Sequence, residues 1–364
     1  MTQGIHLKGL NGVRAIAALS VVITHIVQRF EDFGLPRMHG FEAAGYGVTM
    51  FFTLSGFLIT FLLLKEKEKL GDINIKKFYT RRILRIWPLY YFYLALAVIC
   101  LLLYDKEVLN GNTWFYVLLT ANVPYILQTQ IPLISHLWSI GVEEQFYLFW
   151  PWIVKKTTKL LKWLLLFIGI VLSLKLLFWF YYHKTGNSIP LSIIQITRFH
   201  CMAIGACGAV FFFREDKKFL RFSFSLVTQI VLWLVLALCA LDWFRGVPLI
   251  NDEIIALVTL FLILNVAGNP KTIIPLDNWY INYLGKISFG IYMYHPLIIY
   301  LVAKWAGSFT RTLETDFQYI VIYLLVMFLT IVIAGLSYRF FETPFLRFKD
   351  KFTLVKSSGT ENSP

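Results

Sequence analysis

The chain has 364 residues, of which 58% are hydrophobic and 15% are charged, and its mean hydropathy is +0.65. A soluble domain carries about 25% charged residues, so a single ordinary core cannot hold all of these apolar side chains. The apolar runs are far longer than the roughly 10-residue strands of a membrane barrel, which predicts an all-α polytopic membrane protein.

The hydropathy pattern predicts a bundle of about ten transmembrane helices. Residues 1–346 are expected to form one integral-membrane domain, and residues 347–364 a cytoplasmic basic and polar tail. The apolar segment 114–127 is expected to be re-entrant or interfacial. The ten predicted spans are residues 10–29, 46–64, 86–104, 142–156, 161–182, 191–213, 222–244, 250–267, 281–304 and 317–341.

Basic residues alternate between dense and sparse loops along the chain, so we interpret the net charge of +13 as membrane topology rather than nucleic-acid binding. The dense segments are 65–85, 155–162, 214–221 and the chain after 346. The intervening loops carry Arg37, Lys106, Lys184, Arg245 and Arg311. Ten spans reproduce this alternation, and the positive-inside rule then places both termini in the cytoplasm. The first span lacks a cleavage site and is expected to be retained.

Arg14 and His25 lie in the first span, eleven residues apart. Eleven helical steps make three turns plus about 20° and about 16 Å of rise, so both side chains project from one face. An Arg in the bilayer costs roughly 2.5–3.5 kcal/mol on insertion scales, which marks a candidate site. Two interpretations of His25 are open: a general base that takes a proton from a hydroxyl, or a buried His satisfied by a neighbouring helix.

Two further motifs follow in the second and third spans. The stretch Gly45–Leu58 is rich in small residues and predicts close helix packing, and its Ser55 is not in a G-x-S-x-G elbow. Arg81, Arg82 and Arg85 are helical neighbours in the basic segment that leads into the third span. Three guanidiniums there suit either a phosphate-bearing ligand or a plain positive-inside anchor.

The remaining candidate residues lie at the fourth and ninth spans. Glu143 and Glu144 are adjacent carboxylates at the predicted outer entrance of the fourth span, where Glu143 is expected to orient an imidazole, bind a sugar hydroxyl or cap the helix. The ninth span carries a second intramembrane histidine. The candidate residues around these positions are His136, Trp138, Ser139, Tyr292 and His295. The four cysteines form no C-x-x-C pair and are expected to be small buried thiols, and no metal is expected.

Taken in order, these motifs resemble the acyltransferase 3 family of polytopic membrane enzymes, over roughly residues 7–346. The resemblance rests on Arg14 with His25, Phe51-Phe52…Ser55-Gly56-Phe57, Arg81-Arg82…Arg85…Pro88, Trp138-Ser139…Glu143…Phe146-Tyr147, and Ser288…Tyr292…His295. The chain departs from the family pattern at Asn11, where an acidic residue is frequent, and at Tyr294, where Leu is common.

The resemblance implies an O-acyltransferase that moves an acyl group, acetyl by default, from cytoplasmic acyl-CoA to a carbohydrate hydroxyl outside a bacterial inner membrane. Arg81, Arg82 and Arg85 would hold the coenzyme A phosphates, and the pantetheine arm would pass Arg14 toward His25, the general base. Glu143 would orient His25 or the acceptor, and the residues around His136 and His295 would bind the substrate. The lipid bilayer, and a homo-oligomer or glycan-assembly proteins, are the expected partners.

Two other classes of function are weighed against this one. A transporter or flippase for a glycan or lipid-linked substrate would also place Arg, Glu and His inside the bilayer, but the sequence shows no pair of interrupted spans and no inverted repeat. A scaffold of a glycan-assembly machine predicts that the buried ionisable residues are dispensable. No P-loop pattern is present, which disfavours ATP-driven transport.

Overall fold

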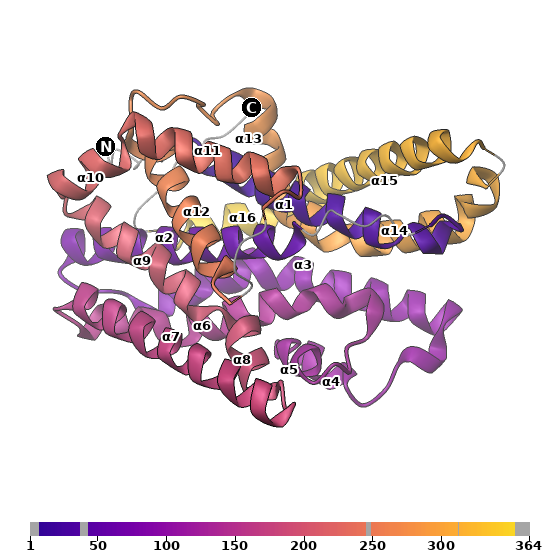
Figure 1. Ribbon diagram of the computed structural model, residues 1–364, viewed down its shortest axis with the longest axis horizontal. Coiled ribbons are helices and arrows are strands. Elements are labelled where there is room, and N and C mark those ends of the chain that lie inside the picture. Colours follow the sequence, from indigo (N-terminus) through magenta and orange to yellow (C-terminus); the bar gives the residue numbers. More distant parts are fainter. Residues whose placement is uncertain (1–6, 37–42, 245–248, 312, 354–364) are drawn as a thin grey trace.

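The computed structural model describes residues 7–36, 43–244, 249–311 and 313–353, and within these ranges the chain is helical, with no β-strand (Figure 1). Three elements are short 3₁₀-helices and η4 is a π-helix. In chain order the elements are α1 (Leu10–Gln28), η1 (Phe30–Phe33), α2 (Ala44–Leu70), α3 (Ile75–Tyr104), η2 (Lys106–Val108), α4 (Thr113–Val117), α5 (Asn122–Ile126), η3 (Pro132–Leu137), α6 (Trp138–Lys156), α7 (Leu160–Thr185), α8 (Ile189–Thr197), α9 (Phe199–Phe213), α10 (Lys217–Ser223), α11 (Leu226–Ala240), α12 (Asn251–Gly268), α13 (Trp279–Lys286), α14 (Ser288–Thr310), α15 (Thr315–Ser337), η4 (Tyr338–Glu342) and α16 (Thr343–Asp350).

Seven helical segments of the described chain are long and apolar enough to cross a membrane, or nine if each of two bent pairs counts as one span. The protein is therefore a multi-pass helical membrane protein, and the count of ten stays a prediction. The predicted fourth span coincides with the 19-residue α6, which is not among these segments and carries two carboxylates and two lysines. The predicted re-entrant segment 114–127 folds as the two short helices α4 and α5.

The two bent pairs are a feature that the sequence did not predict. The axes of α10 and α11 differ by 51°, and those of α13 and α14 by 65°. In the second pair the bend falls around Ile287, between Lys286 at the end of α13 and Ser288 at the start of α14. The bend places the start of α14 beside the interior of the bundle, where Ser288 and Tyr292 are buried.

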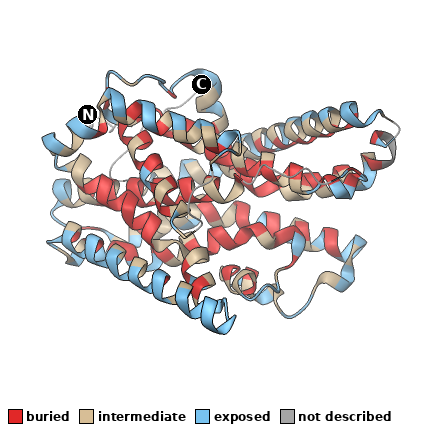
Figure 2. Cartoon of the chain, viewed as in Figure 1, coloured by how far each residue is buried: buried red, intermediate tan, exposed pale blue. Residues whose placement is uncertain are grey.

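Helix α2 lies in the middle of the bundle and is mostly buried (Figure 2). A Cβ atom at Gly56 would lie 2.0 Å from the carbonyl oxygen of Met202 on α9, and one at Gly205 would lie 2.0 Å from that of Thr53. On the side toward α1, a Cβ at Gly47 would lie 2.5 Å from the Ala17 oxygen. Only glycine allows these close approaches, so the predicted role of the small residues in 45–58 is confirmed.

By contrast, α7 and α15 lie at the periphery. In the most apolar 18-residue stretch of α7 only 11% of the residues are buried, and in that of α15–α16 only 22%. The exposed side chains of these helices are largely Leu, Ile and Phe. Apolar side chains facing outward in a long helix are typical of lipid contact. The four cysteines are buried, as predicted.

The densely basic segments meet at one end of the bundle. The Lys155 ammonium donates to Asp72 Oδ2 over 2.7 Å, Arg81 donates to the Phe352 carbonyl oxygen, and Lys65 lies 4.7 Å from the centre of the Phe213 ring. At the other end Arg311 donates to the Phe33 oxygen. The spatial grouping agrees with the predicted alternation, although Arg37, Arg245 and the tail beyond Thr353 lie outside the described residues. Which end faces the cytoplasm stays a prediction.

Candidate active site

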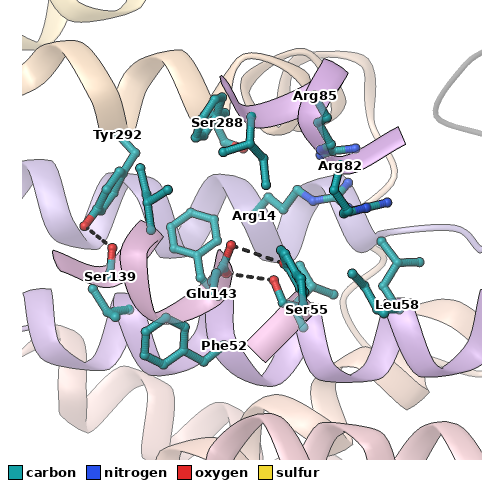
Figure 3. Close-up of a pocket in the computed structure, with 18 residues that line it drawn as sticks. Arg14, Phe52, Ser55, Leu58, Arg82, Arg85, Ser139, Glu143, Ser288 and Tyr292 are labelled. Atoms are coloured by element: carbon teal, nitrogen blue, oxygen red, sulfur yellow. Dashed lines mark hydrogen bonds between the residues drawn. The ribbon is translucent and has the colours of Figure 1, made fainter. Parts of the chain in front are cut away.

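A pocket inside the bundle brings together residues from five helices (Figure 3). Its empty space is about 810 Å³, counting the part open to solvent. The lining residues come from α1, α2, α3, α6 and α14, and they are Arg14, Val48, Phe51, Phe52, Leu54, Ser55, Leu58, Ile59, Arg82, Arg85, Ile86, Ser139, Ile140, Glu143, Tyr147, Ser288, Phe289 and Tyr292.

Three guanidiniums occupy one end of this pocket: Arg14 from α1, and Arg82 and Arg85 from α3 (Figure 3). Arg82 lies over the Tyr147 ring at 5.7 Å from its centre, and its buried Nε has no hydrogen-bond partner in the described chain. Arg14 donates to Asn11 Oδ1 over 3.0 Å. A buried unpaired donor costs about 1–3 kcal/mol, and a hydrogen bond from a guanidinium to an anionic group is among the strong ones.

Arg81 is placed differently from its two neighbours. It does not line the pocket but forms an ion pair of 3.0 Å with Glu66, whose side chain is 3% exposed, and donates to the Phe352 carbonyl oxygen. The predicted triplet is therefore divided: Arg82 and Arg85 line the pocket, whereas Arg81 connects α3 to α2 and to the chain just after α16.

Glu143 is the carboxylate of the pocket. Its Oε1 accepts a hydrogen bond of 2.8 Å from the Ser55 hydroxyl, and its Oε2 accepts one of 3.2 Å from Tyr147 (Figure 3). Glu144 points elsewhere and accepts from the Trp87 indole over 2.8 Å. The two adjacent carboxylates thus have separate partners, and only Glu143 is available to a molecule in the pocket.

At the end of the pocket opposite the arginines, the hydroxyls of Ser139 and Tyr292 are 2.6 Å apart (Figure 3). The Tyr292 hydroxyl also donates to the carbonyl oxygen of His136, over 2.8 Å. These two side chains therefore form the wall between the pocket and the histidine at position 136.

Behind this wall lie three imidazoles that do not line the pocket. His25 Nδ1 and His295 Nε2 are 2.7 Å apart, and the ring centres of His136 and His295 are 5.4 Å apart. His295 is fully buried, whereas His25 is half-buried. In the described chain, no three His, Cys, Asp or Glu side chains are arranged to hold a metal ion.

Trp138, another predicted substrate-binding residue, packs outside the pocket lining. Its ring is stacked on that of Tyr125 with 5.1 Å between the centres, and the Arg198 guanidinium lies 5.8 Å from its centre. Of the predicted substrate-binding residues, only Ser139 and Tyr292 line the pocket.

Two pocket side chains, Ser55 and Tyr147, and the neighbouring Asn11 were missed or discounted at the level of sequence. Asn11 orients Arg14, and a Cβ at Gly285 of α13 would lie 2.0 Å from the Asn11 carbonyl oxygen, which shows how closely α13 packs on α1 there. Ser55 and Tyr147 both donate to Glu143. The signal for Tyr147 was its position four residues after Glu143 on one helix, whereas nothing local pairs Ser55 with Glu143.

The fold is a helical membrane bundle whose interior pocket is lined by arginines and a carboxylate, with three imidazoles close by. Ionisable side chains inside a membrane bundle mark a functional site. The family model described as "Acyltransferase domain" matches residues 7–339, and the chain belongs to this family of membrane acyltransferases.

Two of the curated relatives are proteins of Staphylococcus aureus. A protein of Staphylococcus aureus (strain COL) named "Putative O-acetyltransferase SACOL0978" is 30% identical over 93% of this chain and 57% of its own length. The "O-acetyltransferase OatA" of Staphylococcus aureus (strain NCTC 8325 / PS 47) is 26% identical over 97% of this chain and 60% of its own length. The chain thus spans about three fifths of these relatives. No solved structure matches it.

Proposed function

We propose that this protein is an O-acetyltransferase that moves an acetyl group from acetyl-CoA to a sugar hydroxyl of an envelope or exported polysaccharide. The observation that carries the proposal is the placement of Arg14, Arg82 and Arg85 at one end of a pocket whose other end adjoins the His25–His295 pair. The membership in the acyltransferase family and the names of the relatives support the reaction type. The membrane in question is, on this proposal, a bacterial inner membrane.

The donor end of the pocket is the arginine end. Guanidiniums bind phosphate oxygens through paired, charge-assisted hydrogen bonds, and coenzyme A carries several phosphates. The unpaired Nε of Arg82 is a donor available for such a ligand. The narrow pantetheine arm of coenzyme A would extend past Arg14 and Glu143 toward Tyr292, along the pocket lining. On the predicted topology this donor end faces the cytoplasm.

The acceptor hydroxyl would meet the thioester beside His25. His25 removes the hydroxyl proton as the oxygen attacks the thioester carbonyl, the new C–O bond forms, and the C–S bond breaks. The departing thiolate of coenzyme A then takes up the proton held by His25. Because the Ser139–Tyr292 pair stands between the pocket and the histidines, this proposal requires the thioester to pass that pair. Glu143 would orient the acceptor or the thioester from within the pocket.

Transport of a glycan or lipid-linked substrate is the rival function, and the two bent helix pairs are the observation in its favour. Only the α13–α14 pair contributes to the pocket, since no described residue of α10 or α11 lines it. The two pairs therefore do not form matching halves of one site, as an inverted repeat would require. Hydrolysis or transfer of acetyl-CoA that depends on an acceptor distinguishes the two functions.

The test compares the full-length protein with His25→Gln and with His183→Gln, a control in the exposed part of α7. We expect His25→Gln to abolish transfer of acetyl to a polysaccharide acceptor, measured by mass spectrometry, with acetyl-CoA binding retained by calorimetry. His183→Gln is expected to match the unaltered protein. Retained turnover in His25→Gln would exclude the base role. In cells, loss of one acetyl increment from extracellular glycans in both a deletion strain and a His25→Gln strain would identify the acceptor.

A further inference from the structure

The hydrogen bonds of His295 determine which of its nitrogens carries a proton. Its Nδ1 is 2.7 Å from the backbone carbonyl oxygen of Tyr292, one turn earlier on α14. A carbonyl oxygen only accepts hydrogen bonds, so His295 Nδ1 must be the donor and must carry hydrogen. This assignment follows from the partner atom alone.

The second contact of His295 is with His25, where Nδ1 of His25 and Nε2 of His295 are 2.7 Å apart. The ring centres are 5.0 Å apart and the ring planes differ by 22°, so the two imidazoles lie edge to edge and nearly coplanar. At that distance one nitrogen donates and the other accepts. Donation by His295 Nε2 would require an imidazolium, because its Nδ1 already carries hydrogen.

An imidazolium at His295 is disfavoured by its surroundings. The residue is fully buried, its described hydrogen-bond partners are a carbonyl oxygen and an imidazole, and no described carboxylate forms an ion pair with it. A buried charge without a counter-ion is costly. His295 is therefore neutral, its Nε2 accepts, and the donor is His25 Nδ1.

We infer that His295 is a positioning residue, which holds His25 in the tautomer with hydrogen on Nδ1 and leaves the lone pair on His25 Nε2. The tautomer follows from the contacts alone, whereas its catalytic consequence rests on the proposed function. His295 then takes the place that a carboxylate occupies in a Ser-His-Asp triad, without a negative charge. The chain of hydrogen bonds runs from His25 through His295 to the backbone of α14.

In the proposed reaction, His25 Nε2 is the atom that takes the proton from the acceptor hydroxyl. The imidazolium so formed keeps its Nδ1–H bonded to His295 Nε2, which fixes the ring while the charge is present. When the proton passes from Nε2 to the departing thiolate, the starting tautomer is restored. His295 gains and loses no proton in this cycle.

The first experiment measures the tautomer itself by nitrogen NMR of the full-length protein labelled with ¹⁵N-histidine. The chain contains seven histidines. The signals of the pair are assigned by their loss in His25→Gln and in His295→Gln. We expect both His25 and His295 to show a protonated Nδ1 and an unprotonated Nε2. An unprotonated Nδ1 at His25 overturns the inference, whether or not the protein transfers acetyl groups.

The second experiment compares two variants of His295. In His295→Gln the side-chain carbonyl oxygen can accept from His25 Nδ1, whereas in His295→Leu no acceptor remains. We expect the His25 signals to show the same tautomer in His295→Gln and a changed one in His295→Leu. In kinetics, kcat should fall about 100-fold or more in His295→Leu and less in His295→Gln, and KM for acetyl-CoA should be unchanged in both. His25 signals that are identical in all three proteins would overturn the inference.

A control variant at Tyr292 distinguishes the effect of its backbone carbonyl oxygen on His295 from the effect of its side-chain hydroxyl. Tyr292→Phe removes the hydrogen bonds of the hydroxyl to Ser139 and His136 but keeps the backbone oxygen. We expect the His25 tautomer to be unchanged in this variant. If the tautomer is as inferred while His25→Gln still turns over, the proposed function fails and the positioning by His295 stands.

Discussion

The Ser55 hydroxyl on α2 donates a 2.8 Å hydrogen bond to Glu143 Oε1 on α6, 88 residues further along the chain. The next residue, Gly56, contacts the backbone of Met202 on α9, on another side of the same helix. Close packing on α9 thus fixes the position from which Ser55 reaches Glu143. This relationship connects the packing of the bundle to the chemistry of the pocket.

Replacing Glu143 with Gln keeps the size of the side chain and removes its charge. We expect transfer to fall by about 10- to 100-fold, because the carboxylate orients a reacting group, while the affinity for acetyl-CoA is not weakened, because one negative charge near the phosphate-binding arginines is lost. Ser55→Ala, which removes one hydrogen bond to the same carboxylate, is expected to have a smaller effect. Kinetics and calorimetry of the purified proteins measure both quantities. Weaker binding in Glu143→Gln would contradict the assigned role.

Arg81, Arg82 and Arg85, which precede the third predicted span, are expected to differ in effect. Arg82→Ala and Arg85→Ala should each weaken acetyl-CoA binding by about tenfold or more, since a hydrogen bond to a charged group contributes about 1.5–3 kcal/mol. Arg81→Ala is the matched control: binding should be unchanged, whereas thermal stability should fall because buried Glu66 loses its ion-pair partner and keeps only the hydrogen bond from the Asn74 backbone. Equal losses of binding in all three variants would contradict the division of the triplet.

The glycine contact between α2 and α9 makes a prediction about stability. In Gly56→Ala the new Cβ would lie 2.0 Å from a backbone oxygen, so the helices must separate, and we expect a loss of about 3 kcal/mol or more. Gly169→Ala on α7 is the control, because nothing lies within 4 Å of its Cβ, and the change should be neutral or stabilising by about 0.5–1 kcal/mol. Thermal unfolding in detergent measures both. Similar Tm values for the two variants would contradict the packing argument.

Membrane orientation is tested by accessibility to a membrane-impermeant thiol reagent. Lys69→Cys lies at the end of the bundle where the basic segments meet, and Glu107→Cys lies at the other end, in exposed positions. The four native cysteines are buried and provide a low background. In bacterial spheroplasts we expect only Glu107→Cys to react, and both to react after lysis. The opposite pattern would place the arginines on the outer side and exclude a cytoplasmic donor.

The class of the protein could be predicted from composition, because 15% charged residues and long apolar runs leave only a helical membrane bundle. The candidate site was predicted in part. Arg14, Arg82 and Arg85 line one pocket with Glu143, while Arg81 pairs with Glu66 instead. Helical spacing could not separate these neighbours, because which face of α3 meets α2 depends on packing.

The hydropathy pattern also did not predict the two bent helix pairs. A window of apolar residues has the same mean whether or not the helix bends, so the 65° bend between α13 and α14 did not register in the predicted span 281–304. The bend falls beside Ser288, which lines the pocket, so the missed feature is one that shapes the site.

Composition and the helical period were enough to predict the helical membrane class, the spatial grouping of the basic segments, and the common face of Arg14 and His25. The family was recognised from the order of the motifs and is shown by the family model. The partners depend on how the whole bundle folds: His25 is paired with His295, and Ser55 with Glu143. These pairs lie 270 and 88 residues apart. A local period determines which face a side chain occupies, but packing of the whole bundle determines what that face meets.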